Sequence, residues 1–450
     1  MPTPVGSRRF RPSYRSIWGI SFPIIIAGVS EAIVEITDTI FLAHYGVTEL
    51  AAIGLADSLY TLAMFLSMGV VDGIQIIIGR RAGQRQAPAI GRVFNQGLYL
   101  LVLSSIGMIA FINLVVPLYL GELFASDQVY TAVHGYLRIA VYGLLFQSIN
   151  LAYSAFYVGI SRTRVLIGAA LVLALTNITL DYALIFGRLG FVEQGIEGAA
   201  IASLIAETAT FLFLTLDIIV KGYPERYGLL RLGRWNAKLN RKLLTISWPV
   251  SLDALVELGK WFVLFMIIEQ LGEDVLASAN IIFSCYALYM ISIDSFSETV
   301  CSMVSNLLGQ RRRAELYVLI RQTIKLSYLV VIPLLLLSLL FPTAVLAIFT
   351  PDETMIEASK TGLVVILLAT LLAVPADTLY SAVAGTGDTR ITLAIQCFTT
   401  LSVLSFAAFT ALWVGLPLAI ILLAEVVGWL VCLLLSWAWM RSGRWLRLEI

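Results

Sequence analysis

Charged side chains are scarce in this sequence. Only 13% of its 450 residues are Asp, Glu, Lys or Arg, whereas 59% are apolar, and soluble domains carry about 25% charged residues. This balance predicts an integral membrane protein. The net charge of +1 gives no indication of nucleic-acid binding, so we expect no nucleic-acid partner.

Residues that carry out chemistry are also few. The chain has two histidines and four cysteines, and no cysteine pair has C-x-x-C spacing. The sequence contains no H-E-x-x-H, no D-D-x-x-D and no G-x-x-x-x-G-K-S/T phosphate loop. We therefore expect a protein that is not an enzyme and that has neither a cofactor nor a metal centre.

Long apolar runs dominate the sequence instead. A helix needs about 20 apolar residues to cross the hydrocarbon core, and twelve segments meet this length. The fold class that we predict is an all-α integral membrane protein with twelve transmembrane helices. They are residues 17–43, 51–79, 94–119, 131–158, 163–187, 195–220, 243–270, 277–308, 317–349, 356–385, 390–415 and 417–440.

Basic residues set the expected orientation. All but four of the 30 Lys and Arg residues lie in the two tails, in the even-numbered connections or at the ends of the spans beside them; the exceptions are Arg138, Arg188, Lys260 and Lys360. Cytoplasmic loops carry such an excess. Both termini are therefore expected in the cytoplasm, in a multi-pass protein of the cell (inner) membrane.

The two halves of the chain resemble each other at a fixed offset of 226 residues. The matching pairs include Ser21 with Ser247, Pro23 with Pro249, Glu31 with Glu257, Gly46 with Gly272, and Gly159 with Gly385. Each half holds six helices, so both have the same orientation, as parallel repeats do. We predict an N-lobe (1–220), a cytoplasmic basic linker (221–242) and a C-lobe (243–450).

Three acids lie within the first span. Glu31, Glu35 and Asp38 are four and three residues apart, which puts them on one face of a helix. Charge inside a bilayer is costly, unless the group faces a water-filled cavity, takes up a proton or holds a monovalent cation. We interpret this face as a cation- or proton-handling site; structural pairing or capping is the alternative. Pro23 removes a backbone hydrogen bond before it and predicts a hinge.

Two further sets of polar residues fit such sites. Asn177 and Asp181 share a face of the fifth span and can complete a proton or monovalent-cation site with Asp38; a helix–helix hydrogen bond is the alternative. In the C-lobe we assign a cavity to Asp253, Glu257, Lys260 and Asp377. Other acids were assigned structural roles: Glu207, Asp294, Glu298 and Glu425.

Lys260 stands three residues after Glu257 in the middle of a predicted span. This spacing predicts an ion pair between them, with snorkelling to an interface as the alternative. A paired Glu257 would be held by a fixed cation, and coupling would then rest on the N-lobe with a proton favoured over sodium.

Several of these stretches together resemble the multidrug and toxic compound extrusion (MATE) transporters over nearly the whole chain. The resemblance is carried by Pro23 and Asp38-Thr39, HYGVTELAAIGLA, NITLDYALIFGRLG, SWPVSLDALVE and AGTGDTR. It implies two six-helix lobes that form a V. It also implies antiport, by alternating access, of organic and mostly cationic compounds against protons or sodium ions. Asp38, Asn177 and Asp181 match the family's N-lobe site, and Glu257 and Asp377 match acids that some members use in the C-lobe.

Two other functions were weighed. A flippase of lipid-linked precursors or an exporter of an anionic metabolite belongs to the same wider superfamily, but it often has a more basic cavity and sometimes fourteen helices. A membrane-embedded enzyme would need a nucleophile or metal constellation. We expect a small-molecule substrate, the lipid bilayer as surroundings and a monomer.

Overall fold

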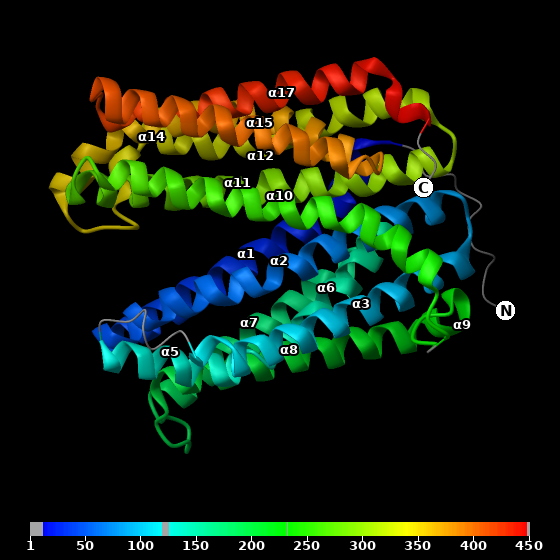
Figure 1. The fold of residues 1–450 in the computed structure, drawn as a ribbon, viewed down its shortest axis with the longest axis horizontal. Helices are drawn as coiled ribbons and strands as arrows, with labels where there is room; N and C mark the ends of the chain where they lie inside the picture. Colours follow the sequence, from blue (N-terminus) through cyan, green and yellow to red (C-terminus); the bar gives the residue numbers. More distant parts are fainter. Residues whose placement is uncertain (1–11, 119–125, 232, 448–450) are drawn as a thin grey trace. The chain divides into compact units, whose positions relative to one another are not determined.

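The computed structural model describes residues 12–118, 126–231 and 233–447, in which all regular elements are helices. These residues form two compact units. The N-unit is Phe22–Ser251, and the C-unit is the described chain up to Ser21 together with the chain from Leu252 onward. In Figure 1 most of the N-unit is drawn in blue to green and most of the C-unit in green to red.

Among the described residues, seven helices lie wholly within the N-unit. They are α2 (Val47–Gly83), α3 (Ala87–Leu114), α5 (Asp127–Ala140), α6 (Gly143–Gly159), α7 (Arg164–Ile185), α8 (Gly195–Val220) and the short α9 (Tyr223–Tyr227). Their core includes Ala56, Val133 and Leu144, which are almost fully buried. The fourth predicted span is not one straight helix, since α5 and α6 meet at a bend of 50° immediately before Gly143.

The C-unit contains a matching set. Its helices are α11 (Glu273–Gly309), η1 (Arg313–Glu315), α12 (Leu316–Leu340), α13 (Pro342–Leu346), α14 (Glu353–Gly385), α15 (Thr389–Ala408) with a π-helical end (Phe409–Val414), α16 (Leu418–Ile421), α17 (Leu423–Ser442) and η3 (Arg444–Arg447). Local chemistry fixes several ends. Asp352 accepts a hydrogen bond from the Thr354 amide (2.8 Å) and caps α14. Gly443, at φ +66°, ends α17 in the left-handed region.

Most of the predicted spans are confirmed by length and composition. In the described residues ten helices can cross a membrane, and the bent α5–α6 pair makes an eleventh. The twelfth predicted span is α10 (Ala237–Glu269), which is 33 residues long. It is less apolar than the others because Asp253, Glu257 and Lys260 lie near its middle.

The first helix of each repeat passes from one unit into the other. The unit boundary in α1 (Tyr14–Tyr45) follows Ser21, and in α10 it follows Ser251. Both boundaries lie within two residues of a proline inside the helix, Pro23 and Pro249. A proline leaves a helix without one backbone hydrogen bond, so the chain changes units where each helix is weakest. The hinge at Pro23 stays a prediction.

The two repeats also use equivalent packing positions. In the C-unit, Ser21 Oγ donates to Thr299 Oγ1 at 2.8 Å. In the N-unit, Ser247 packs on Gly73, where an added Cβ would lie 2.4 Å from Ser247 Oγ. Ser21 and Ser247 are 226 residues apart, and so are Gly73 and Thr299. The internal repeat is therefore present in contacts as well as in sequence.

The segment predicted as a linker is packed against the N-unit. Asn95 Nδ2 on α3 donates to the Gly228 carbonyl (2.8 Å), and Asn95 Oδ1 accepts from the Leu230 amide (2.9 Å). Gln96 Oε1 accepts from Asn240 Nδ2 (2.9 Å). The lobe boundaries that we predicted at residues 220 and 243 stay a prediction. The compact units of the structure have their boundaries within α1 and α10.

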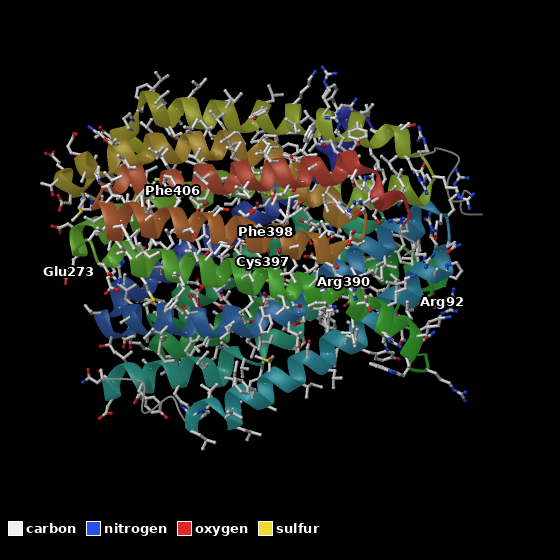
Figure 2. All side chains as sticks on the ribbon, turned by 45° about the horizontal axis from the view of Figure 1, so that its top comes forward. Arg92, Glu273, Arg390, Cys397, Phe398 and Phe406 are labelled. Atoms are coloured by element: carbon white, nitrogen blue, oxygen red, sulfur yellow. The ribbon has the colours of Figure 1, made fainter. Side chains whose placement is uncertain are left out.

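The two ends of the C-unit carry charges of opposite sign. Figure 2 shows Arg390 and Glu273 toward opposite ends of this unit, with Cys397, Phe398 and Phe406 on α15 between them. Glu273 and Asp274 open α11 at one end. Arg311, Arg312 and Arg313 follow α11 at the other end, which we call the basic end. This separation agrees with a positive-inside orientation.

Candidate cation-binding sites

The N-unit brings together the three residues that the sequence assigned to one site. Asp181 and Asn177, one turn apart on α7, are 0% and 2% exposed. Asp38 on α1 approaches from the other side, and its carboxyl group lies within hydrogen-bonding reach of the Asp181 carboxyl group. Two carboxyl groups can form a hydrogen bond only when one of them carries a proton.

Several oxygen atoms at this site lack a protein donor. Both carboxylate oxygens of Asp181, Oδ1 of Asp38 and Oδ1 of Asn177 are buried and accept no hydrogen bond from the described residues. Asn177 Nδ2 donates to Ser203 Oγ at 3.2 Å, which fixes the amide and leaves its oxygen available. Buried acceptors without donors are costly. A proton or a cation between them would satisfy these oxygens.

The rest of the acidic face of α1 is open. Glu31 and Glu35 are exposed, and Glu35 lies within electrostatic range of both Glu31 and Asp38. The helical spacing thus predicted the face correctly. Neither Glu31 nor Glu35 lies within hydrogen-bonding reach of Asp181 as Asp38 does, and their assignment to cation binding stays a prediction.

Three N-unit residues near these acids were not predicted as site residues from the sequence. Asp57 on α2 lies within electrostatic range of Glu35 and Asp38. Tyr136 on α5 is near Asp38, Asp57 and Asp181. Glu207 Oε2 on α8 accepts from Asn150 Nδ2 at 2.8 Å, and Glu207 is also near Glu31. Asp57 is the single acid in the apolar run LADSLY, and this feature of the sequence could have identified it as a candidate site residue.

The C-unit gathers a second set of acids. Tyr380 Oη on α14 donates to Asp253 Oδ1 at 2.5 Å. Asp294 on α11 lies within electrostatic range of Asp377 and Glu257, although the sequence assigned Asp294 a structural role. The structure thus places Asp294 beside two of the residues that we predicted for this cavity. Among the described residues no group of three His, Cys, Asp or Glu side chains has the geometry of a metal site.

The predicted Glu257–Lys260 ion pair is wrong. Lys260 Nζ lies 3.7 Å from Glu425 Oε1 on α17 and 4.4 Å from the ring centre of Trp261. The side chains of Lys260 and Glu425 are only 7% and 3% exposed, whereas Glu257 is exposed. Positions three apart share a helix face, but the buried side chain of Lys260 packs against Glu425 and Trp261 instead of Glu257. In the part of the chain that the structure describes, no cation is therefore paired with the Glu257 carboxylate.

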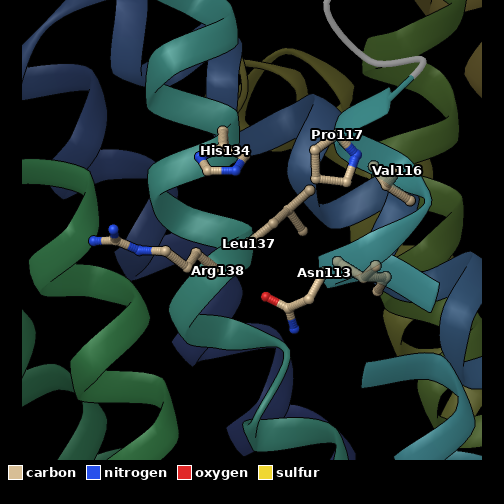
Figure 3. Close-up of a pocket in the computed structure, with 7 residues that line it drawn as sticks. Asn113, Val116, Pro117, His134, Leu137 and Arg138 are labelled. Carbon is tan, nitrogen blue, oxygen red and sulfur yellow. The ribbon is translucent and has the colours of Figure 1, made fainter. Parts of the chain in front are cut away.

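A small pocket of the N-unit lies apart from these acids. Figure 3 shows it between α5, which carries His134 and Arg138, and the segment Asn113–Pro117 that ends α3. Its cavity volume is about 10 Å³, which is room for one water molecule. It is too small to hold an organic substrate.

These observations define a multi-pass helical membrane protein of two repeats, with carboxyl groups inside each repeat. The model of the MatE family matches residues 23–183 and again residues 249–409. The two matches are offset by the same 226 residues as the internal repeat. The chain belongs to the MatE family.

Similar proteins come from several bacteria and an archaeon. "Probable multidrug resistance protein NorM" of Thermotoga maritima is 24% identical over 82% of this chain and 79% of its own length. The protein of the same name from Xylella fastidiosa strain 9a5c is 25% identical over 94% and 92%. A solved MOP superfamily transporter from Pyrococcus furiosus is 22% identical and superimposes with a TM-score of 0.88 over 96% of both chains. The similarity to the solved structure shows the fold alone.

Proposed function

We propose that this protein is a secondary antiporter that exports organic, mostly cationic compounds by alternating access. The observation that carries the proposal is the approach of Asp38 and Asp181 at a buried site whose oxygens lack protein donors. Such a pair binds one positive charge and releases it when the carboxyl groups separate. The printed names of the NorM relatives, which are multidrug resistance proteins, support export of drugs.

We propose the proton as the coupling ion. A proton between Asp38 and Asp181 removes one of two negative charges that a buried site would otherwise hold together. Asn177 Oδ1 with the carboxylate oxygens could also ligate sodium, because hard cations prefer oxygen ligands. Lys260 is paired with Glu425 and not with Glu257, so the two acids of the N-unit alone favour the proton. No further cofactor is part of it.

The charge inside the two units favours cationic substrates. Glu31, Glu35 and Asp57 are exposed acids of the N-unit, and Glu257 and Asp294 are exposed acids of the C-unit. The buried lysine, Lys260, is paired with Glu425. An exporter of an anionic lipid precursor would need cations in these places. We propose a monomer in the inner membrane with both termini in the cytoplasm.

The test is efflux from proteoliposomes that hold the purified protein and a fluorescent organic cation. A pH gradient without sodium should drive transport, and a sodium gradient at equal pH on both sides should drive little. Transport under the sodium gradient alone would show that the coupling ion is sodium and not the proton, while the proposed antiport would still hold. Absence of transport under both gradients, with substrate binding intact, would contradict the proposed antiport.

A further inference from the structure

A crevice of about 640 Å³ opens between helices of the C-unit at its basic end. Tyr317, Arg321 and Lys325 line it from α12, each one turn after the last. Trp437 and Arg441 face them from α17, and Leu379 closes the crevice from α14. None of these residues belongs to either acidic site.

The three cations of the crevice form no ion pair with any acid of the described residues. Arg321, Lys325 and Arg441 are all exposed, and none takes part in an ion pair within the described residues. The Arg441 guanidinium lies 5.1 Å from the ring centre of Trp437 and stacks on it. By contrast, Arg312 and Lys360 of the same unit are paired with Glu315 and Glu357. The crevice thus concentrates unneutralised positive charge.

The walls of the crevice are held in place. Tyr317 Oη donates to the Met440 carbonyl at 3.0 Å and joins α12 to α17. Tyr328 Oη donates to the Leu371 carbonyl at 2.9 Å and joins α12 to α14. The rest of the lining is apolar or aromatic and includes Ile324, Tyr328 and Leu379, which we call the apolar floor. The crevice thus combines cationic and apolar walls.

Arg321 lies at about the depth of a lipid headgroup, and Lys325 lies one helical turn deeper. Arg321 and Lys325 follow the first residue of α12 by five and nine positions, which is about 8 and 14 Å along the helix. The headgroup region of one leaflet is about 5–8 Å thick, and long basic side chains reach toward it. The positive-inside rule assigns this end to the cytoplasmic leaflet.

We infer that this crevice binds an anionic phospholipid of the cytoplasmic leaflet. The phosphate lies among Arg321, Lys325 and Arg441, and an acyl chain lies along Ile324, Tyr328 and Leu379. Basic pockets between transmembrane helices bind such headgroups. An organic cation would be repelled by the three charges, and a soluble phosphate would leave the apolar floor uncovered.

Binding is measured by native mass spectrometry of the purified full chain in detergent, titrated with dioleoylphosphatidylglycerol or dioleoylphosphatidylcholine. The test variant combines Arg321→Gln, Lys325→Gln and Arg441→Gln. The control variant removes three exposed cations outside the crevice, by Lys238→Gln, Arg313→Gln and Arg390→Gln. The test variant should lose about 100-fold in affinity for phosphatidylglycerol, at about fivefold per cation, and the control should lose much less. Phosphatidylcholine binding should not change.

A second measurement does not depend on the triple variant. Phosphatidylglycerol with brominated acyl chains should quench the fluorescence of Trp437. The Trp437→Phe variant should therefore show less quenching than the wild-type protein. Equal binding of both lipids, equal losses in the two variants, or no contribution of Trp437 to quenching would overturn the inference. Displacement of phosphatidylglycerol by equimolar glycerol 3-phosphate would also overturn it, because the occupant would then be a soluble phosphate.

Discussion

Asp38 is the residue through which coupling can be tested most directly. Asp38→Asn keeps the size of the side chain but removes the proton that it would share with Asp181. We expect export driven by a pH gradient to fall to a small but measurable residual rate in proteoliposomes, while expression and monodispersity stay near wild type. Asp274→Asn, an exposed acid in the first turn of α11, is the matched control and should transport normally. Gradient-driven efflux by purified Asp38→Asn at the wild-type rate would refute the role.

Asp181 and Asp38 should act in coupling as one unit and not as two independent sites. If the two carboxyl groups share one proton, either substitution by Asn removes the same event. The double variant Asp38→Asn/Asp181→Asn should therefore transport at a rate no lower than that of the slower single variant. Initial rates of efflux from a double-mutant cycle measure this. Losses that add fully in the logarithm of the rate would mean that the two acids act separately.

At the scale of elements, Lys260 and Glu425 join α10 to α17 inside the C-unit. Removal of one partner leaves a buried charge without compensation, at a cost of about 3–5 kcal/mol in proteins. Lys260→Met and Glu425→Gln should each lower the thermal midpoint of the detergent-solubilised protein. The double variant Lys260→Met/Glu425→Leu should recover much of the loss, because two apolar side chains replace the pair. A double variant no more stable than either single one would count against the pair.

Close packing of α2 on the first part of α10 gives another prediction at this scale. A Cβ on Gly69 would lie 2.1 Å from Ser251 Oγ and 2.6 Å from the Ser247 carbonyl oxygen, so backbone must move to accept it. Gly69→Ala should destabilise the protein by about 1–3 kcal/mol, measured as a lower thermal midpoint. Gly54→Ala on the same helix meets no atom within 4 Å and is the control. Equal stability of the two variants would disprove the contact.

For the whole molecule, the distribution of basic residues predicts the orientation. Single cysteines at Lys238 and Glu273, each in a variant whose four native cysteines are replaced by serine, report the two sides. A membrane-impermeant maleimide should label Glu273→Cys on intact cells and Lys238→Cys only after the cells are opened. The reverse pattern would place the termini outside.

Much of the architecture follows from the sequence. The length of the apolar runs predicted the helices, because each span must satisfy its own backbone hydrogen bonds in lipid. The 226-residue offset predicted the repeat, which recurs in the equivalent contacts of Ser21 and Ser247. Asp38, Asn177 and Asp181 were predicted to meet, since each is a polar group on an apolar helix. The V-shaped arrangement of the lobes stays a prediction.

Partners across helices were decided only by the tertiary structure. Lys260 pairs with Glu425 across 165 positions of sequence, although Glu257 lies one turn away, because the rotation of α10 turns Lys260 into the bundle. Asp57 on α2 and Tyr136 on α5 lie near Asp38 on α1, and helical periodicity within one helix does not predict such neighbours. The basic crevice needs α12, α14 and α17 together. Helical periodicity fixes which residues share a face of one helix, whereas the neighbour of that face depends on how side chains pack across several helices.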